Sequence, residues 1–315
     1  MHRALLALKI VVTVALLGGV LAAADLRALD GLLRDASFGY FVFAVGALVA
    51  QTVVLAGRFR AIVAALGRPL GVRSAIELSF VGVLFNQALP SAIGGDAIRA
   101  WRLRGLGHPW REAVNAVLLD RGMGVLVLAV LAGVAVSVEP SGVFAPLRSA
   151  LWIVAGAGVA MLAIGAAADR LPLLPAVVRR LLVASGVPAA ARIVFATRVT
   201  AGAAALSAAS HLLAVLGAYW VAAALGIELA PGTFATIALC VLLATMIPLS
   251  YGGWGIREAG AVWLFARAGV PAESALAISV LFGAALFVAS LPGLAFFWLA
   301  PARDRVTASS ASLTP

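Results

Sequence analysis

Long apolar stretches dominate this chain, and short polar segments rich in arginine separate them. Each stretch holds about 20 apolar residues, the length that crosses the hydrocarbon core of a bilayer as a helix. A lipid-exposed segment must satisfy its own backbone hydrogen bonds, so we expect spanning helices here. The six stretches are 4–24, 37–56, 113–137, 147–167, 200–225 and 275–300.

Two further apolar stretches, 74–98 and 233–266, are interrupted by proline and paired glycine, which break helices. The first lies between 57–73 and 99–112, two linkers rich in arginine. Arginine-rich loops face the cytoplasm, so we expect 74–98 to enter and leave the membrane on that side. The topology of the remaining spans makes 233–266 a second re-entrant hairpin, which enters from outside.

The two interrupted stretches resemble each other. Residues 86–99 read NQALPSAIGGDAIR and residues 245–258 read TMIPLSYGGWGIRE, and both contain Pro-x-x-x-Gly-Gly-x-x-Ile-Arg. The offset between Pro90 and Pro248 is about half of the chain. We therefore predict two repeats, 37–137 and 200–300, with inverted topology. The fold class is an all-α integral membrane protein with about six spanning helices and two broken re-entrant hairpins.

Composition supports a membrane protein and excludes other classes. Hydrophobic residues make up 63% of the 315 residues and charged residues 11%, where a soluble domain has about 25% charged residues. The net charge of +10 indicates loops that face anionic lipid headgroups rather than a nucleic-acid partner. The single cysteine and the three separated histidines predict no disulfide, metal site or cofactor.

We expect one transmembrane domain over residues 1–301, followed by a flexible cytoplasmic tail over 302–315. The first stretch is compatible with a signal peptide, but its apolar run favours an uncleaved helix. Arginine placement puts both termini in the cytoplasm and suits the inner membrane of a prokaryotic cell.

Each break is followed by a position where a helix can restart. The first N–H groups of a helix favour an anion, and Arg99 and Arg257 follow one to two turns later. Arginine binds phosphate with paired hydrogen bonds. The paired glycines also suit close helix packing, and Arg99 also suits a cytoplasmic basic cluster.

Charged residues within the apolar segments require partners. Asp120 and Arg121 are adjacent on a helix and point about 100° apart, so we expect each to pair with another group. Asp96 with Arg121, or Glu258 with Arg99, would connect a hairpin to the rest of the fold. The carboxylates also suit proton transfer. The substrate-binding candidates are Asn86, Pro90, Ser91, Gly94, Gly95, Asp96, Arg99, Asp120, Arg121, Pro248, Ser250, Tyr251, Gly252, Gly253, Trp254, Arg257 and Glu258.

Over about residues 40–300 the chain resembles the lysylphosphatidylglycerol synthase transmembrane-region family. The resemblance rests on Asn-x-x-x-Pro-x-x-x-Gly-Gly-Asp-x-x-Arg, on Asp-Arg in the next helix, and on Pro-x-Ser-x-Gly-Gly-x-Gly-x-Arg-Glu. The matching residues are Asn86, Pro90, Gly94, Gly95, Asp96, Arg99, Asp120, Arg121, Pro248, Ser250, Gly252, Gly253, Gly255, Arg257 and Glu258.

The resemblance implies a flippase-like membrane domain. In the best-known relatives this domain moves aminoacylated phosphatidylglycerol, and a separate soluble domain performs the aminoacyl transfer. The 315 residues hold no such domain, so we do not expect aminoacyl-lipid synthesis. Stand-alone relatives are linked to glycolipid, polyprenyl-phosphate-sugar or hopanoid pathways, which leaves the lipid open.

We therefore expect a non-enzymatic lipid flippase for an anionic phospholipid or a polyprenyl-phosphate-linked lipid. One alternative is a non-catalytic membrane partner of a glycosyltransferase or lipid-modifying enzyme. A second is a membrane enzyme acting on a lipid-linked phosphate or sugar, although no motif for a nucleophile or a metal pair supports it.

Overall fold

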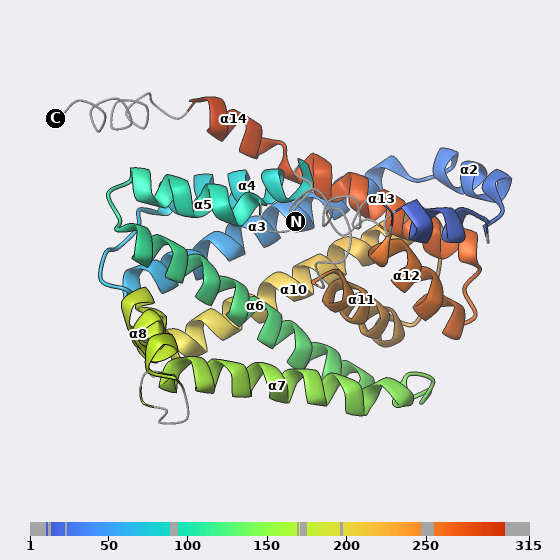
Figure 1. Cartoon of the computed structure of the whole chain (residues 1–315). Helices are drawn as coiled ribbons and strands as arrows, with labels where there is room; N and C mark the ends of the chain where they lie inside the picture. Colours follow the sequence, from blue (N-terminus) through green and yellow to red (C-terminus); the bar gives the residue numbers. More distant parts are fainter. Residues whose placement is uncertain are drawn as a thin grey trace.

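The computed structural model describes residues 11, 14–22, 24–88, 94–168, 170, 175–195, 198–246 and 255–299, and the regular elements within them are all helices (Figure 1). This confirms the all-α fold class. In the described residues, five helical segments are long and apolar enough to span a membrane. The chain is therefore a multi-pass membrane protein.

The five spans agree with five of the six predicted stretches. The first predicted span, 4–24, lies largely outside the described residues, and its residues 14–22 are helical. At 1.5 Å per residue the longest spans extend about 40 Å, more than the roughly 30 Å hydrocarbon core. The spanning helices are α3 (Phe38–Ala65), α6 (Trp110–Val138), α7 (Arg148–Ala167, after a 3₁₀ turn at Ala145–Leu147), α10 (Arg198–Ala224), and α13 (Ala272–Ser290) continued by α14 (Pro292–Leu299).

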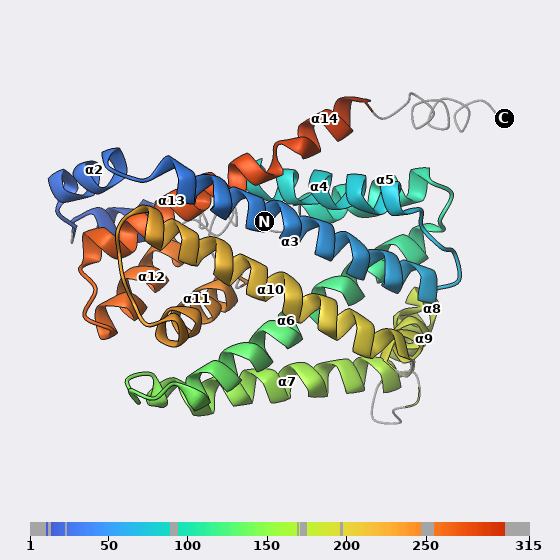
Figure 2. The same ribbon diagram turned by 180° about the vertical axis from the view of Figure 1, so that it is seen from behind.

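Each interrupted stretch forms a pair of helices. The first pair is α4 (Val72–Ala88) and α5 (Gly94–Gly105), and the second is α11 (Pro231–Thr245) and α12 (Ile256–Arg267). The helices of each pair pack side by side, and the two pairs lie toward opposite ends of the molecule (Figures 1 and 2). Re-entry into the membrane and inverted topology remain predictions.

Shorter helices occupy two of the predicted connecting segments. Helix α2 (Leu26–Arg34) begins after Asp25, whose carboxylate accepts the backbone N–H groups of Arg27 and Ala28 at 2.9 and 3.3 Å. An aspartate at this position satisfies N–H groups that lack a partner within the helix. Helices α8 (Ala176–Ser185) and α9 (Val187–Phe195) lie in the linker after α7.

Two predicted linkers, 57–73 and 99–112, are partly helical. Helix α5 continues to Gly105, and its Arg99 and Arg102 are buried. The segment 57–73 was expected to be a cytoplasmic linker, but α3 continues to Ala65 and includes Arg58. The Arg58 side chain is buried and forms an ion pair with Asp120. A buried charge is tolerated in an apolar helix when a counter-charge neutralises it, so this arginine does not mark the end of the span.

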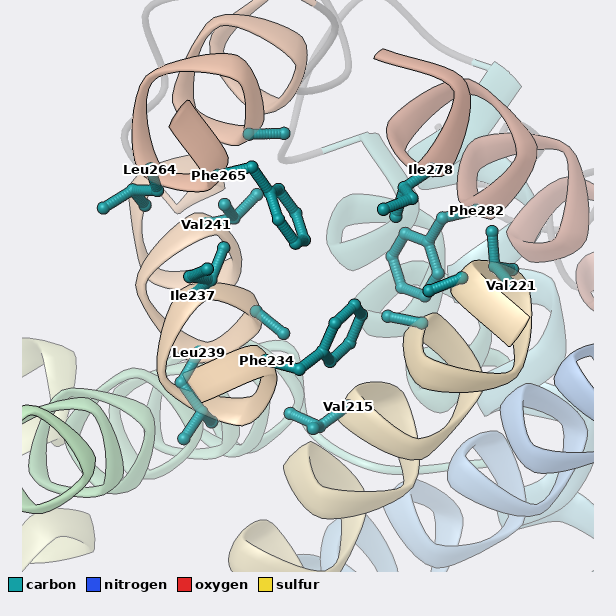
Figure 3. Close-up of a cluster of buried hydrophobic side chains, with 14 of the residues drawn as sticks. Val215, Val221, Phe234, Ile237, Leu239, Val241, Leu264, Phe265, Ile278 and Phe282 are labelled. Carbon is teal, nitrogen blue, oxygen red and sulfur yellow. The ribbon is translucent and has the colours of Figure 1, made fainter. Parts of the chain in front are cut away.

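Two apolar cores hold the helices together. In one, the rings of Phe234, Phe265 and Phe282 from α11, α12 and α13 converge with aliphatic side chains (Figure 3). The other joins α3 to α4, α5, α6, α9 and α10 and includes Phe59, fully buried in α3. Helices α3 and α6 contribute to both cores, and polar side chains between these contributions form the site described below.

A polar contact fixes the far end of α6. Glu139 follows the last residue of α6 and accepts hydrogen bonds from Ser141 Oγ at 2.6 Å and Thr233 Oγ1 at 3.0 Å. The Ser141 bond, with a smaller contribution from Thr233, lowers the pKa of the Glu139 carboxyl. The ionised form therefore ties α6 to the start of α11.

Candidate functional site

Asp120 is the centre of a buried ionic cluster. Its carboxylate lies in α6 and accepts a hydrogen bond from Arg58 Nε at 2.7 Å and another from Arg99 Nη1 at 3.0 Å. Arg58 also donates to Ser207 Oγ of α10 at 3.0 Å. These contacts join α3, α5, α6 and α10, and Asp120 is 2% exposed. The cluster thus connects four helices and also concentrates charge inside the protein.

The start of α5 carries the second carboxylate of the cluster. Asp96 forms an ion pair with Arg121 Nε and lies 3.5 Å from Arg99 Nη1. The predicted pair of Asp96 and Arg121 is therefore confirmed, and it joins the first helix pair to α6. The prediction that the adjacent residues Asp120 and Arg121 bind different partners is also confirmed.

A side chain of α4 contacts the start of α5. Asn86 Oδ1 accepts the backbone N–H of Gly95 at 3.0 Å, so one N–H at the start of α5 is already satisfied. The guanidinium of Arg99 lies 4.0 Å above the ring of Phe59. Arg99 is also buried, and its assignment to a cytoplasmic basic cluster remains a prediction.

Glycines permit the close packing around these charges. A Cβ on Gly95 would collide with the backbone oxygen of Gly82 and lie 2.7 Å from Asn86 Cγ. A Cβ on Gly124 would lie 2.9 Å from Arg58 Nη1. Because real Cβ atoms are not found at such distances, a larger residue here would displace backbone or charged groups.

A cavity of about 200 Å³ adjoins the cluster. Among the described residues, Ser79 Oγ and Arg99 Nε are buried without a hydrogen-bond partner, and both residues line this cavity. Buried polar groups usually have partners, so these two point to a polar occupant. The lining residues are Gln51, Leu55, Arg58, Ser79, Gly82, Val83, Asn86, Arg99, Asp120, Arg121, Gly124, Val125, Ser210, His211 and Met246.

Two further lining residues come from α10 and from the end of α11. His211 Nε2 lies 2.9 Å from the carbonyl oxygen of Gly124, and this contact joins α10 to α6. Met246 follows α11 and stands just before the second break. Asn86, which precedes the first break, and Met246, which precedes the second, therefore line the same cavity.

The second break has a self-contained ionic group. Glu258 accepts bonds from Arg257 at 2.7 and 2.9 Å, from Ser279 Oγ at 3.1 Å, and from the Gly255 backbone N–H at 2.6 Å. The predicted partnership of Glu258 with Arg99 is therefore wrong. Glu258 is the third residue of α12 and folds back to satisfy the start of its own helix, where it also neutralises Arg257.

The arginines of the two matching motifs are thus placed differently. Arg99 lines the charged cavity, whereas Arg257 lines a small apolar cavity with Phe234, Phe265 and Phe282. Gly255 precedes α12 with a φ of 89°, a conformation that favours glycine.

Nine of the predicted site residues are described, and eight lie outside the described part of the chain. The structure brings Asn86, Asp96, Arg99, Asp120 and Arg121 together, with Gly94 and Gly95 at the start of α5. Arg257 and Glu258 form the separate group. The residues outside the described part are Pro90, Ser91, Pro248, Ser250, Tyr251, Gly252, Gly253 and Trp254.

Sequence reasoning missed Arg58, Ser79 and Ser207. A signal for Arg58 existed, because Phe59, Ile62 and Val63 continue the apolar pattern past it with helical spacing. The two serines carry no comparable signal. Within the described residues, no group of three or more His, Cys, Asp or Glu side chains is arranged to hold a metal ion.

Comparison with known proteins gives one family. The family model for the lysylphosphatidylglycerol synthase TM region matches residues 6–293 of the 315. The match includes four of the five spans in full, the last span as far as residue 293, both helix pairs and the described lining of the charged cavity. No curated protein shows significant similarity to the chain.

Proposed function

The chain belongs to the lysylphosphatidylglycerol synthase TM-region family, and from this we propose that it moves an anionic lipid between the leaflets of the membrane. The lipid is a phospholipid or a polyprenyl-phosphate-linked lipid. Its phosphate binds in the charged cavity, held by Arg58, Arg99 and Arg121, while its hydrocarbon chains stay in the apolar surroundings.

The charge of the cavity is the observation that carries this proposal. Three arginines face two carboxylates, Asp96 and Asp120, which leaves one positive charge in excess. The break segments 89–93 and 247–254 contain no Asp, Glu, Lys, Arg or His, so they add no formal charge. A buried excess charge is costly, and an anion that enters the cavity would neutralise it.

Hydrogen-bonding capacity supports the same ligand. Arg99 Nε and Ser79 Oγ offer buried donors without partners among the described residues. A phosphate accepts several hydrogen bonds, and its bonds to guanidinium groups are stronger than neutral ones. Both carboxylates are held by arginines, which supports binding rather than general acid–base catalysis.

The depth of the cavity supports transport rather than surface binding. Asp120, Arg121, Gly124 and Val125 lie about 15–23 Å along α6 from Trp110, at 1.5 Å per residue. This is near the middle of the helix. Charged residues at membrane depth mark substrate pathways, and transporters place their sites near the midplane at broken helices.

The test is lipid translocation by the full chain in proteoliposomes. Fluorescent phosphatidylglycerol and a fluorescent polyprenyl phosphate would be compared, with an impermeant reductant reporting the outer leaflet. Arg121→Gln is the informative variant because its side chain is 36% exposed and tolerates change better than Arg58. We expect its translocation rate to fall at least tenfold while the melting temperature in detergent stays within a few degrees.

Arg34→Gln is the matched control, since Arg34 pairs with Asp30 on an exposed surface. It should leave the rate unchanged. If the wild type moves neither lipid, the proposal is wrong, and co-purification with a lipid-modifying enzyme would then favour a partner role. Equal rates for wild type and Arg121→Gln would remove this arginine from the headgroup site.

A further inference from the structure

A second hollow lies beside the charged cavity, between α5 and α6. It has a volume of about 420 Å³ and a predominantly apolar lining. Helix α5 contributes Asp96, Ala97 and Ala100, and the residue after α11 contributes Met246. The α6 residues are Trp110, Val114, Val117, Leu118, Arg121 and Val125. We call this hollow the α5–α6 groove.

The spacing on α6 makes the groove a continuous channel along one helix face. Apart from the adjacent residues Val117 and Leu118, its α6 residues follow intervals of three and four from Trp110 to Val125, which place them on one side of a helix. From Trp110 to Arg121 the rise is about 16 Å, roughly half of the hydrocarbon thickness. The groove therefore runs from one end of α6 to the depth of the charged cavity.

The groove and the charged cavity adjoin each other. Arg121, Val125 and Met246 line both. Among the described lining residues, the two charged ones, Asp96 and Arg121, pair with each other at this junction, and the others are apolar. At the outer side, Trp110 and Leu118 are 51% and 55% exposed, so the groove opens to the surroundings of the helix.

We propose that the α5–α6 groove binds one hydrocarbon chain of the lipid whose phosphate occupies the charged cavity. This inference rests on the proposed function and adds the position of one hydrocarbon chain of the lipid. A surface that changes from charged to apolar at one junction complements a molecule with an anionic head and an apolar tail. Burial of apolar chain surface adds about 25 cal/mol per Å² to binding. The lipid enters sideways from the bilayer between α5 and α6.

The experiment is photo-labelling of the full chain in proteoliposomes. The probe is phosphatidylglycerol with a diazirine at the end of one chain, and mass spectrometry locates the labelled peptides. We expect labelling to concentrate on residues 110–118. Val114→Trp places a bulky ring in the groove and should reduce this labelling at least fivefold.

Val134→Trp is the matched control, because Val134 lies on the same helix, is 43% exposed and does not line the groove. It should leave labelling at 110–118 unchanged. The inference would be overturned if labelling were spread equally over residue 134 and the groove and if Val114→Trp left it unchanged. Labelling that avoids 110–118 would also overturn it and would mean that protein covers the groove.

Labelling does not require transport, so the two proposals fail separately. Labelling of the groove without translocation of the same lipid would support the groove and refute the transport function. Translocation that persists unchanged in Val114→Trp, with no labelling at 110–118, would support transport and refute the groove.

Discussion

Replacement of Asp120 by asparagine tests how strongly the buried cluster holds the fold. The asparagine keeps one oxygen for Arg58 but presents an NH₂ group to Arg99, where the carboxylate now accepts a bond at 3.0 Å. Two guanidinium groups lose their shared counter-charge at a site that is 2% exposed. Removal of one partner from a buried ion pair costs about 3–5 kcal/mol.

This cost corresponds to a change of roughly 150- to 5,000-fold in the unfolding equilibrium constant. The assay is reversible unfolding by a denaturing detergent in mixed micelles, followed by circular dichroism. Asp30→Asn is the control, because Asp30 pairs with Arg34 at 2.9 Å on the surface. There the loss should be under about 1 kcal/mol. Equal losses for both variants would refute the view that burial makes the cluster strong.

Three further predictions concern the packing, the ionic pair and the pH dependence. Gly95→Ala should lower the free energy of unfolding by about 1–3 kcal/mol because its Cβ meets backbone, whereas Gly46→Ala, with open space around it, should be neutral or stabilising in the same unfolding assay. Exchange of Asp96 and Arg121 in one double variant should recover at least half of the melting temperature lost by either single reversal; no recovery would contradict direct pairing. Because the pKa of Glu139 is lowered on folding, its stabilisation is present above the ordinary glutamate pKa and is lost as pH falls below about 4. Melting curves of Glu139→Gln should therefore show a smaller loss between about pH 5 and 3 than the wild type, and parallel curves would count against this role.

The spanning helices and the helix pairs were predictable because their signals are local. A run of apolar residues predicts a span from its length alone, and paired glycine near a proline predicts a break. The pairing of Asp96 with Arg121 was also accessible, since isolated charges at membrane depth need partners and few are available. These inferences depend only on the free-energy cost of placing a charge, or a backbone group without a hydrogen-bond partner, in lipid.

The position of Arg58 was not predictable by the same rule. Arginine near the end of an apolar run usually marks the cytoplasmic boundary, and the rule cannot distinguish this from a buried arginine whose counter-charge lies 62 positions away. The ion pair with Asp120, which forms only in the folded protein, is what allows Arg58 to lie inside the span. The unpaired donors of Ser79 and Arg99 likewise depend on which helices pack together, which no local pattern reports.

The two breaks have the same arginine in their sequence motifs but different chemistry, and the position of a carboxylate explains why. In the first motif Asp96 precedes Arg99, and the residue after the arginine is Ala100. In the second, Glu258 follows Arg257. Because Glu258 folds back onto the start of α12, Arg257 is neutralised within its own helix. Arg99 lies 3.5 Å from Asp96 of its own helix, but Asp96 also pairs with Arg121, and Arg99 shares Asp120 with Arg58. The excess positive charge therefore arises in the first half of the chain, and the proposed anion site is one-sided although the two motifs match in sequence.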